Sequence, residues 1–194
     1  KRFFEPLGMP DTGFRLPRHN LGRFSALYEA TPADPMQLAD PREDSVYGNE
    51  VTTLSGGAGL LSTATDYARF LQMMLNGGEL EGTRLLSRKT VELMTTNHLP
   101  GGADLTDVAI AGSFTETPYE GVGFGLGFSV NLGPARSARA GSAGEFAWGG
   151  MASTAFWVDP VEDLVVIFMT QLMPSGTFNF RGQLKSLIYS AITD

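Results

Sequence analysis

The chain has 194 residues, of which 42% are hydrophobic and 18% are charged, a composition typical of a globular domain with a buried core. Its 14 Lys and Arg residues against 21 Asp and Glu residues give a net charge of -7, which argues against a nucleic-acid partner. The absence of cysteine excludes disulfides and cysteine-ligated zinc, and the two separated histidines, His19 and His98, disfavour a metal site built from histidine. No apolar run has the length of a membrane span.

The chain begins at Lys1 without a signal-peptide pattern and continues directly into Phe3 and Phe4. We expect a fragment, or a processed chain, whose first half lies elsewhere. The compartment stays undetermined, with a slight preference for the cytoplasm.

Residues 1–57 are rich in proline and in Pro-Asp, Asp-Pro and Gly-Asn steps, which predict loops with little regular structure. Apolar residues then recur at helical spacing over residues 67–75, after Thr63 and Asp66, which are spaced as a capping box. The glycine pair that begins at Gly77 would end this helix.

A shorter helix is predicted over residues 87–94, after which the period of the apolar residues changes to two. We predict one strand over residues 121–130 whose large apolar side chains alternate with glycines and a serine: Phe124, Leu126, Phe128 and Val130. Residues 152–158 and 164–171 flank a turn and predict an antiparallel hairpin. An amphipathic helix over residues 180–191 would cover this sheet. Helices followed by a meander and a final helix predict an α+β fold.

Glycine accounts for 24 of the 194 residues, which raises the question of a phosphate-binding loop. Residues 54–60 lack the Gly-Lys-Ser/Thr ending of a P-loop, and the glycines of residues 121–127 lack GxGxxG spacing. The segments around Ser129 and Ser142 each miss the GxSxG pattern of a hydrolase by one glycine. No nucleotide, metal or other cofactor is predicted.

Three segments, in their order and approximate spacing, resemble the class C β-lactamase-like serine hydrolases, and among these most closely the family VIII carboxylesterases. They are FEPLGMPDT at residues 4–12, GGAGLLSTATDYARF at residues 56–70 and WGGMASTAFWVDP at residues 148–160. The resemblance covers nearly the whole chain but only the C-terminal half of that family's usual length.

This resemblance implies part of the serine β-lactamase and penicillin-binding-protein-like fold, an antiparallel sheet flanked by helices plus an all-helical subdomain. Residues 1–120 would then hold a loop-rich segment and part of the helical subdomain. Residues 121–194 would hold the last strands and the C-terminal helix of the α/β subdomain.

In that family a Ser-x-x-Lys helix carries the nucleophile and its base, because a serine hydroxyl reacts poorly without a base within hydrogen-bond reach. This chain has no Ser-x-x-Lys, since Leu86 and Gly182 stand three positions before Lys89 and Lys185. We therefore expect the nucleophile to lie outside this chain. The Tyr-x-Asn that begins at Tyr47 follows the residue 4–12 segment, whereas the family tyrosine precedes it, and we interpret it as a turn.

The resemblance assigns the family's third active-site motif, Lys-Thr-Gly in β-lactamases, to Trp148, Gly149 and Gly150, which would bind the substrate. The amide of Met151 would be one of two oxyanion donors. A Cβ at either glycine would crowd an acyl substrate that lies against the strand. Because tryptophan lacks the cation that would pair with the carboxylate of a β-lactam, we expect neutral acyl esters as substrates.

Two other functions stay open: a catalytically silent penicillin-binding-like module that binds a ligand or a partner, and a true class C β-lactamase. Trp148 favours the esterase, because ligand-binding relatives usually keep a cation on this strand. The expected partners are a small-molecule ester and the N-terminal half of the same fold.

Overall fold

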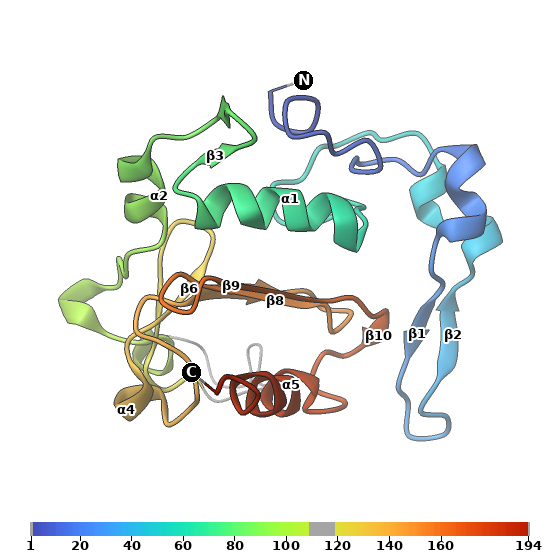
Figure 1. Cartoon of the computed structure of the whole chain (residues 1–194). Helices are drawn as coiled ribbons and strands as arrows, with labels where there is room; N and C mark the ends of the chain where they lie inside the picture. The colour runs from blue at the N-terminus through green and yellow to red at the C-terminus, as the bar shows by residue number, and fades with distance from the viewer. Residues whose placement is uncertain (1, 109–118, 194) are drawn as a thin grey trace.

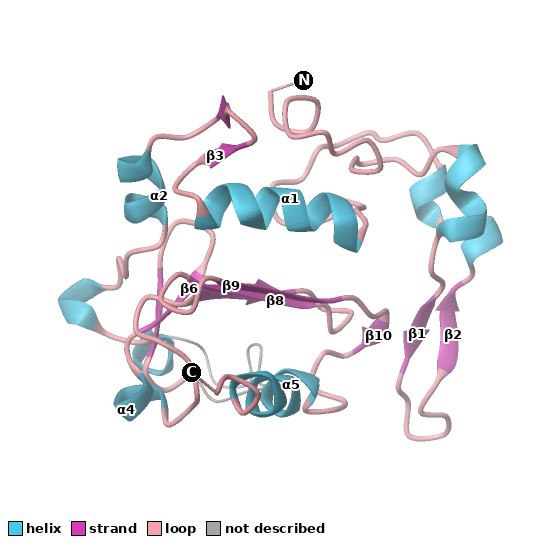
Figure 2. Ribbon diagram, in the orientation of Figure 1, coloured by secondary structure: helices cyan, strands magenta, loops and turns pink. Residues whose placement is uncertain are grey.

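The computed structural model describes residues 2–108 and 119–193. Its central sheet has five strands in the order β5-β6-β7-β8-β9 (Figures 1 and 2). The strands are β5 (Val122–Phe124), β6 (Ser129–Asn131), β7 (Phe146–Gly149), β8 (Ala155–Asp159) and β9 (Leu164–Phe168). All neighbouring pairs are antiparallel. The predicted hairpin is confirmed as β8 and β9.

Two helices lie on opposite sides of this sheet (Figure 1). Helix α1 (Ala64–Leu75) packs against β8 and β9 on one side, and α5 (Phe180–Tyr189) lies on the other. The predicted cap of α1 is confirmed, because Thr63 Oγ1 accepts a hydrogen bond of 3.2 Å from the amide of Asp66. With the shorter α2 (Arg88–Met94), these helices confirm an α+β fold.

The single strand predicted over residues 121–130 is wrong, because the chain reverses at residues 125–128 and forms β5 and β6 instead. Gly125 donates its amide hydrogen to the carbonyl of Phe128 at 2.8 Å, which closes the turn. Gly127 has a φ of +95°, and a Cβ at Gly125 would overlap the carbonyl of Met94. Leu126 is half exposed at the tip of this turn, so the alternating pattern combined two strands and the turn between them.

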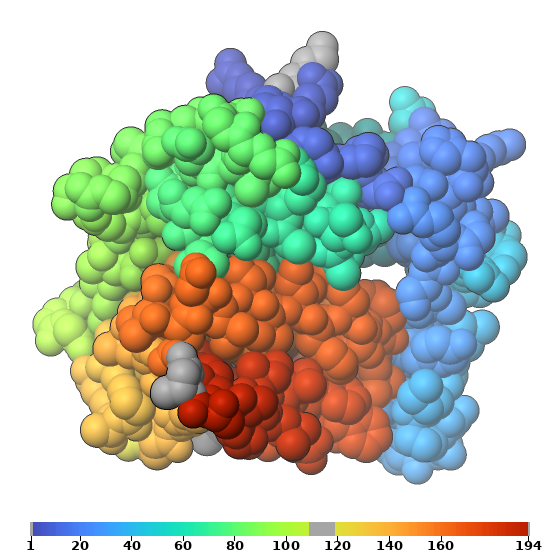
Figure 3. All heavy atoms as spheres, viewed as in Figure 1, coloured from blue at the N-terminus to red at the C-terminus, as the bar shows by residue number. Residues whose placement is uncertain are grey.

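Residues 1–57 contain more regular structure than predicted. Strand β1 (Leu27–Glu29) lies between β2 (Gln37–Asp40), which is antiparallel to it, and β10 (Leu172–Met173), which is parallel to it. In the space-filling view β1 and β2 form an arm beside the main body (Figure 3). The remaining short elements are η1 (Arg18–Arg23), η2 (Arg42–Asp44), η3 (Val46–Gly48), β3 (Glu79–Leu80), β4 (Thr83–Arg84), η4 (Pro100–Gly102), α3 (Leu105–Val108) and α4 (Pro134–Ser137).

The main hydrophobic core joins α1 to the sheet and includes the N-terminal segment. Leu7, Leu71 and Met73 are fully buried, and they belong to the same cluster as Phe146 and Val158 of the sheet. Burial of such side chains stabilises a fold by roughly 1.5–3 kcal/mol each. Both parts of the chain contribute to this core, and the division at residue 120 stays a prediction. None of the helices in the described ranges has the length and apolar character that a membrane crossing requires.

Candidate active site

The tryptophan of the predicted motif lies near the end of β7, between β6 and β8. Trp148 pairs with Phe156 of β8, and its ring meets the ring of Phe124 edge to face, with 5.0 Å between the centroids. The side chain is half-buried and packs against the main core. Trp148 therefore packs against the core and also lies next to the end of β7, where the motif continues into the following turn.

A tight turn follows the tryptophan and connects β7 to β8. The amide of Gly150 donates to the carbonyl of Thr154 at 2.9 Å, and the amide of Ser153 donates to the carbonyl of Gly150 at 3.1 Å. Ser153 is fully buried with a φ of +70°, and its Oγ donates to the carbonyl of Leu172 at 2.7 Å. The amide of Leu172 in turn donates to the carbonyl of Ala152 at 3.1 Å. The turn is therefore held on both sides by the chain's own hydrogen bonds.

Met151 is the most exposed part of this turn. Its side chain is 70% exposed. Within residues 2–108 and 119–193, no oxygen accepts a hydrogen bond from its amide. The turn thus presents the N–H of Met151 as an unused donor, exposed and immediately after the Trp-Gly-Gly segment.

The protein itself fills the space beside the two glycines. A Cβ at Gly149 would overlap the guanidinium of Arg181, which reaches the strand from the first turn of α5. A Cβ at Gly150 would overlap Thr154 Oγ1. The close approach of a substrate to these glycines stays a prediction, and the structure shows that Arg181 and Thr154 also lie close to them.

A cavity of about 750 Å³ lies between the sheet and α5. Trp148, Gly149 and Gly150 line one part of it, together with Asn179 and Arg181 from the beginning of α5. The segment predicted to bind substrate is therefore next to an open space, although Arg181 of α5 and Thr154 of the turn lie against its glycines.

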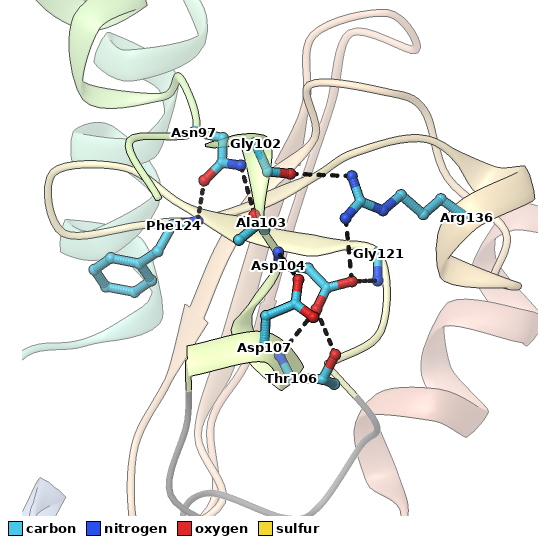
Figure 4. Close-up of polar contacts among 9 residues, drawn as sticks. All are labelled: Asn97, Gly102, Ala103, Asp104, Thr106, Asp107, Gly121, Phe124 and Arg136. Atoms are coloured by element: carbon cyan, nitrogen blue, oxygen red, sulfur yellow. Dashed lines mark hydrogen bonds and ion pairs between the residues drawn. The ribbon is translucent and has the colours of Figure 1, made fainter. Parts of the chain in front are cut away.

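A buried carboxylate fixes the segment that leads into β5 (Figure 4). The side chain of Asp104 accepts hydrogen bonds from the amides of Thr106 and Gly121, at 3.0 and 2.9 Å, and from the Thr106 hydroxyl. Arg136 lies 3.5 Å from the same carboxylate. The hydrogen bonds from Thr106 and Gly121 lower the pKa of Asp104.

Asn97 connects this segment to Phe124 of β5 (Figure 4). Its Oδ1 accepts a hydrogen bond of 3.0 Å from the amide of Phe124, and its Nδ2 donates to the carbonyl of Ala103 at 2.9 Å. Phe124 is the residue whose ring meets Trp148. Asn97 thereby positions one neighbour of the motif without touching the motif itself.

A second buried polar cluster joins α5 to the sheet. Lys185 Nζ lies 2.6 Å from Glu145 Oε1, and the Tyr189 hydroxyl lies 2.7 Å from Glu145 Oε2. The same hydroxyl lies 2.8 Å from Asp159 Oδ2. Burial raises the pKa of Glu145 against the opposing effect of Lys185, and burial together with the contact to Glu145 raises the pKa of Tyr189.

The other candidate groups lie apart from this arrangement. Tyr47 is in η3, where its ring meets the ring of Phe24 at 6.0 Å, so it belongs to the packing of the first 57 residues. His98 Nε2 is 2.7 Å from the carbonyl of Leu93. Among the residues that the structure describes, no three His, Asp or Glu side chains gather in a way that could hold a metal ion.

The residues that hold the motif were not identified from the sequence. Arg181 appeared there only as part of an amphipathic helix, and Ser153 and Thr154 only as part of a predicted strand. Their roles depend on contacts across 19 to 31 positions of the chain, for which a single sequence carries no periodic signal. The glycines at 149 and 150 are the one available sign that something approaches the strand closely.

Comparison with known proteins identifies relatives over almost the whole chain. The family model described as Beta-lactamase matches residues 1–188. Protein Rv1367c of Mycobacterium tuberculosis (strain ATCC 25618 / H37Rv) is 36% identical over 181 residues, which are 90% of this chain and 42% of that protein.

Solved structures agree on the fold. Simvastatin synthase (LovD) from Aspergillus terreus, in its LovD6 mutant, is 22% identical with a TM-score of 0.75, over 97% of this chain and 48% of that one. EstCE1, a hydrolase with promiscuous acyltransferase activity, is 23% identical with a TM-score of 0.73, over 97% of this chain and 49% of that one. The chain thus spans about half the length of these proteins.

Proposed function

The chain belongs to the Beta-lactamase family, and we propose that it forms the C-terminal half of the fold of a serine carboxylesterase that acts on short-chain acyl esters through an acyl-enzyme. The unused amide of Met151, at the end of the Trp-Gly-Gly segment, carries this proposal. A serine nucleophile and its base would come from residues outside this chain, because the chain has no Ser-x-x-Lys.

The chemistry proposed for Met151 follows from what ester cleavage requires. When a hydroxyl attacks the ester carbon, the carbonyl oxygen becomes negatively charged. A fixed N–H aimed at that oxygen stabilises the transition state by about 3 kcal/mol. The Met151 amide suits this role, because its turn is fixed by neighbouring hydrogen bonds and its own hydrogen is unused within the described part of the chain. The second donor would be the amide of the nucleophile.

Trp148 supports esters over β-lactams as substrates. An indole presents an apolar surface with one N–H, whereas a lysine at this position would present a cation to the carboxylate of a β-lactam. EstCE1 is described as a hydrolase with promiscuous acyltransferase activity, which agrees with this proposal, although the substrate class is inferred from Trp148 itself.

The test is an assay of the whole protein on p-nitrophenyl butyrate and on a chromogenic cephalosporin. We expect Trp148→Lys to reduce kcat/KM for the ester by about 5- to 150-fold, which corresponds to 1–3 kcal/mol for a changed pocket contact, and to increase cephalosporin turnover. Trp148→Ala should reduce ester turnover without that increase, because it supplies no charge.

Phe124→Leu is the matched control, since it removes the same ring contact from outside the Trp-Gly-Gly segment. If Trp148→Lys and Trp148→Ala both keep wild-type ester kinetics, Trp148 is only a core residue and a ligand-binding module becomes the better proposal. If the wild-type protein prefers the cephalosporin, it is a β-lactamase.

A further inference from the structure

We propose that Arg181 is a positioning residue that fixes the direction of the Met151 N–H, an inference that rests on the proposed function. Arg181 is at the second position of α5, on the cavity side of the sheet. Its Nη2 donates to the carbonyl of Thr154 at 3.0 Å and lies 3.3 Å from the carbonyl of Gly150. One guanidinium therefore spans both ends of the turn that contains Met151.

The connection between the Gly150 carbonyl and the Met151 amide is covalent. Both groups belong to one trans peptide unit, in which the C=O and the N–H point in opposite directions within a single plane. Among the described residues the only cis peptide precedes Pro174. Holding the Gly150 oxygen toward Arg181 and the Ser153 amide therefore directs the Met151 N–H away from them.

Arg181 also affects how strongly that N–H can donate. Hydrogen bonds accepted by a peptide oxygen polarise the whole unit and strengthen its N–H as a donor. A guanidinium adds a full positive charge to this effect, and it cannot be deprotonated in a protein. The arginine thus strengthens the hydrogen bond from the Met151 N–H to the substrate's oxyanion, on the far side of the peptide unit, without touching the substrate.

Gly149 completes the arrangement. Its missing side chain is what lets the guanidinium lie against β7, because a Cβ there would overlap it. The carbonyl of Thr154 lies 2.8 Å from the same Cβ position, so a side chain at Gly149 would meet main chain even if the arginine moved aside. The glycine of the motif and the arginine of α5 therefore form one packing unit, although 32 positions separate them in the sequence.

The first measurement compares an ester with its thionoester in the whole protein. Sulfur accepts hydrogen bonds poorly, so a working oxyanion donor favours the oxygen substrate in the transition state. We expect Arg181→Ala to lower kcat roughly 10- to 100-fold with KM within about twofold, and to reduce the preference for the oxygen ester. Arg181→Lys should recover part of both, because an ammonium can reach one of the two carbonyls.

Arg84→Ala is the matched control. Arg84 donates to two main-chain carbonyls, those of Gly77 and Leu86, in the β3–β4 hairpin. The Arg84→Ala substitution removes the same charge and the same kind of contact at a different place in the fold. It should leave kcat and the preference for the oxygen ester unchanged. An Arg181→Ala variant that slows oxygen ester and thionoester equally would overturn the inference and leave Arg181 with a structural role.

The second measurement does not require activity. In whole protein labelled with 15N-methionine, the residual dipolar coupling of the Met151 N–H reports the direction of that bond. Arg181→Ala should change this coupling while the buried Met73 and Met74 keep theirs. An unchanged Met151 coupling in a folded variant would overturn the inference, whereas a changed coupling in a protein that hydrolyses no ester would reject the proposed function alone.

Discussion

Lys185 Nζ of α5 lies 2.6 Å from Glu145 Oε1, and their side chains are only 18% and 3% exposed. The Tyr189 hydroxyl adds two short contacts, to Glu145 and to Asp159. The Tyr189 hydroxyl therefore joins two buried carboxyl groups through a single oxygen. Asp159 also accepts three amide hydrogens, from Ser142, Val161 and Glu162, whereas burial raises the pKa of Glu145.

Replacing Glu145 should reveal its raised pKa in the pH dependence of stability. Burial raises the pKa of Glu145 in the folded state, so its stabilising contribution is present below its ordinary value, near 4.3, and is lost as pH rises through the raised value. We therefore expect the free energy of unfolding of the wild type, minus that of Glu145→Gln, to fall between pH 4 and pH 8.

Urea unfolding at several pH values measures this difference, with Glu162→Gln on the exposed β8–β9 turn as the control. A difference that rises with pH would mean that the ion pair with Lys185 outweighs burial.

Asp104→Asn should show the opposite dependence. Hydrogen bonds from Thr106 and Gly121 lower the pKa of Asp104, so its contribution is present above the ordinary value, near 3.9, and is lost as pH falls through the lowered value. The wild type minus Asp104→Asn difference should therefore rise between pH 2 and pH 5. Asp107→Asn makes a useful comparison, because among the described residues the Asp107 side chain accepts a hydrogen bond only from the Asp104 amide. A flat curve would show that Asp104 titrates alike in the folded and unfolded states.

Helix α1, helix α5 and the β8–β9 hairpin could be predicted because each carries a local signal: an apolar period, a cap or a turn. The division of residues 121–130 into two strands could not be predicted, because two short strands joined by a tight turn keep the same alternation of apolar residues as one strand. β1, β2 and β10 are two to four residues long and pair across as many as 144 positions, which a single sequence does not encode as a pattern.

For the candidate site, the sequence identified the motif but not the residues that hold it. Trp148, Gly149 and Gly150 were recognised as a contiguous segment. Arg181 meets them only because α5 folds back over the sheet, so no local pattern could predict that contact. The reason for the glycines therefore had to come from the structure.

Two glycines in positive-φ positions should differ sharply when replaced by alanine. Gly82 has a φ of +80° with open space around it, so Gly82→Ala should cost only the backbone strain, about 1–2 kcal/mol. Gly78 has a φ of +98°, and a Cβ there would overlap the carbonyl of Leu86. Gly78→Ala should cost about 1–3 kcal/mol more. Urea unfolding of both variants measures these two free-energy differences. Equal losses of unfolding free energy in the two variants would mean that the segment between β4 and α2, which contains Leu86, moves aside freely.

Residues 1–194 produced alone should not hydrolyse p-nitrophenyl butyrate. The chain has no Ser-x-x-Lys and offers only one of the two proposed oxyanion donors. The measurement is the release of nitrophenol compared with buffer. Turnover that a substitution within this chain abolishes would show that the nucleophile lies here after all, and Tyr47 and Ser142 would be the first positions to replace.

The same polypeptide should associate with itself through β9. This strand is at one edge of the five-stranded sheet in the described part of the chain, and all five of its residues, Leu164–Phe168, are apolar and only half-buried. An apolar edge strand with unpaired main-chain groups is a template for pairing with another chain.

A charge on that edge should block the association. Val166→Lys places a lysine in the middle of β9, whereas Val161→Lys places one on the exposed β8–β9 turn, away from the edge. We expect sedimentation to show dimers or larger species for the unmodified polypeptide and for Val161→Lys, and a monomer for Val166→Lys. Circular dichroism would check that both variants fold. A wild-type monomer with a cooperative thermal transition would contradict this prediction and would show that residues 1–194 are stable without a partner on this edge.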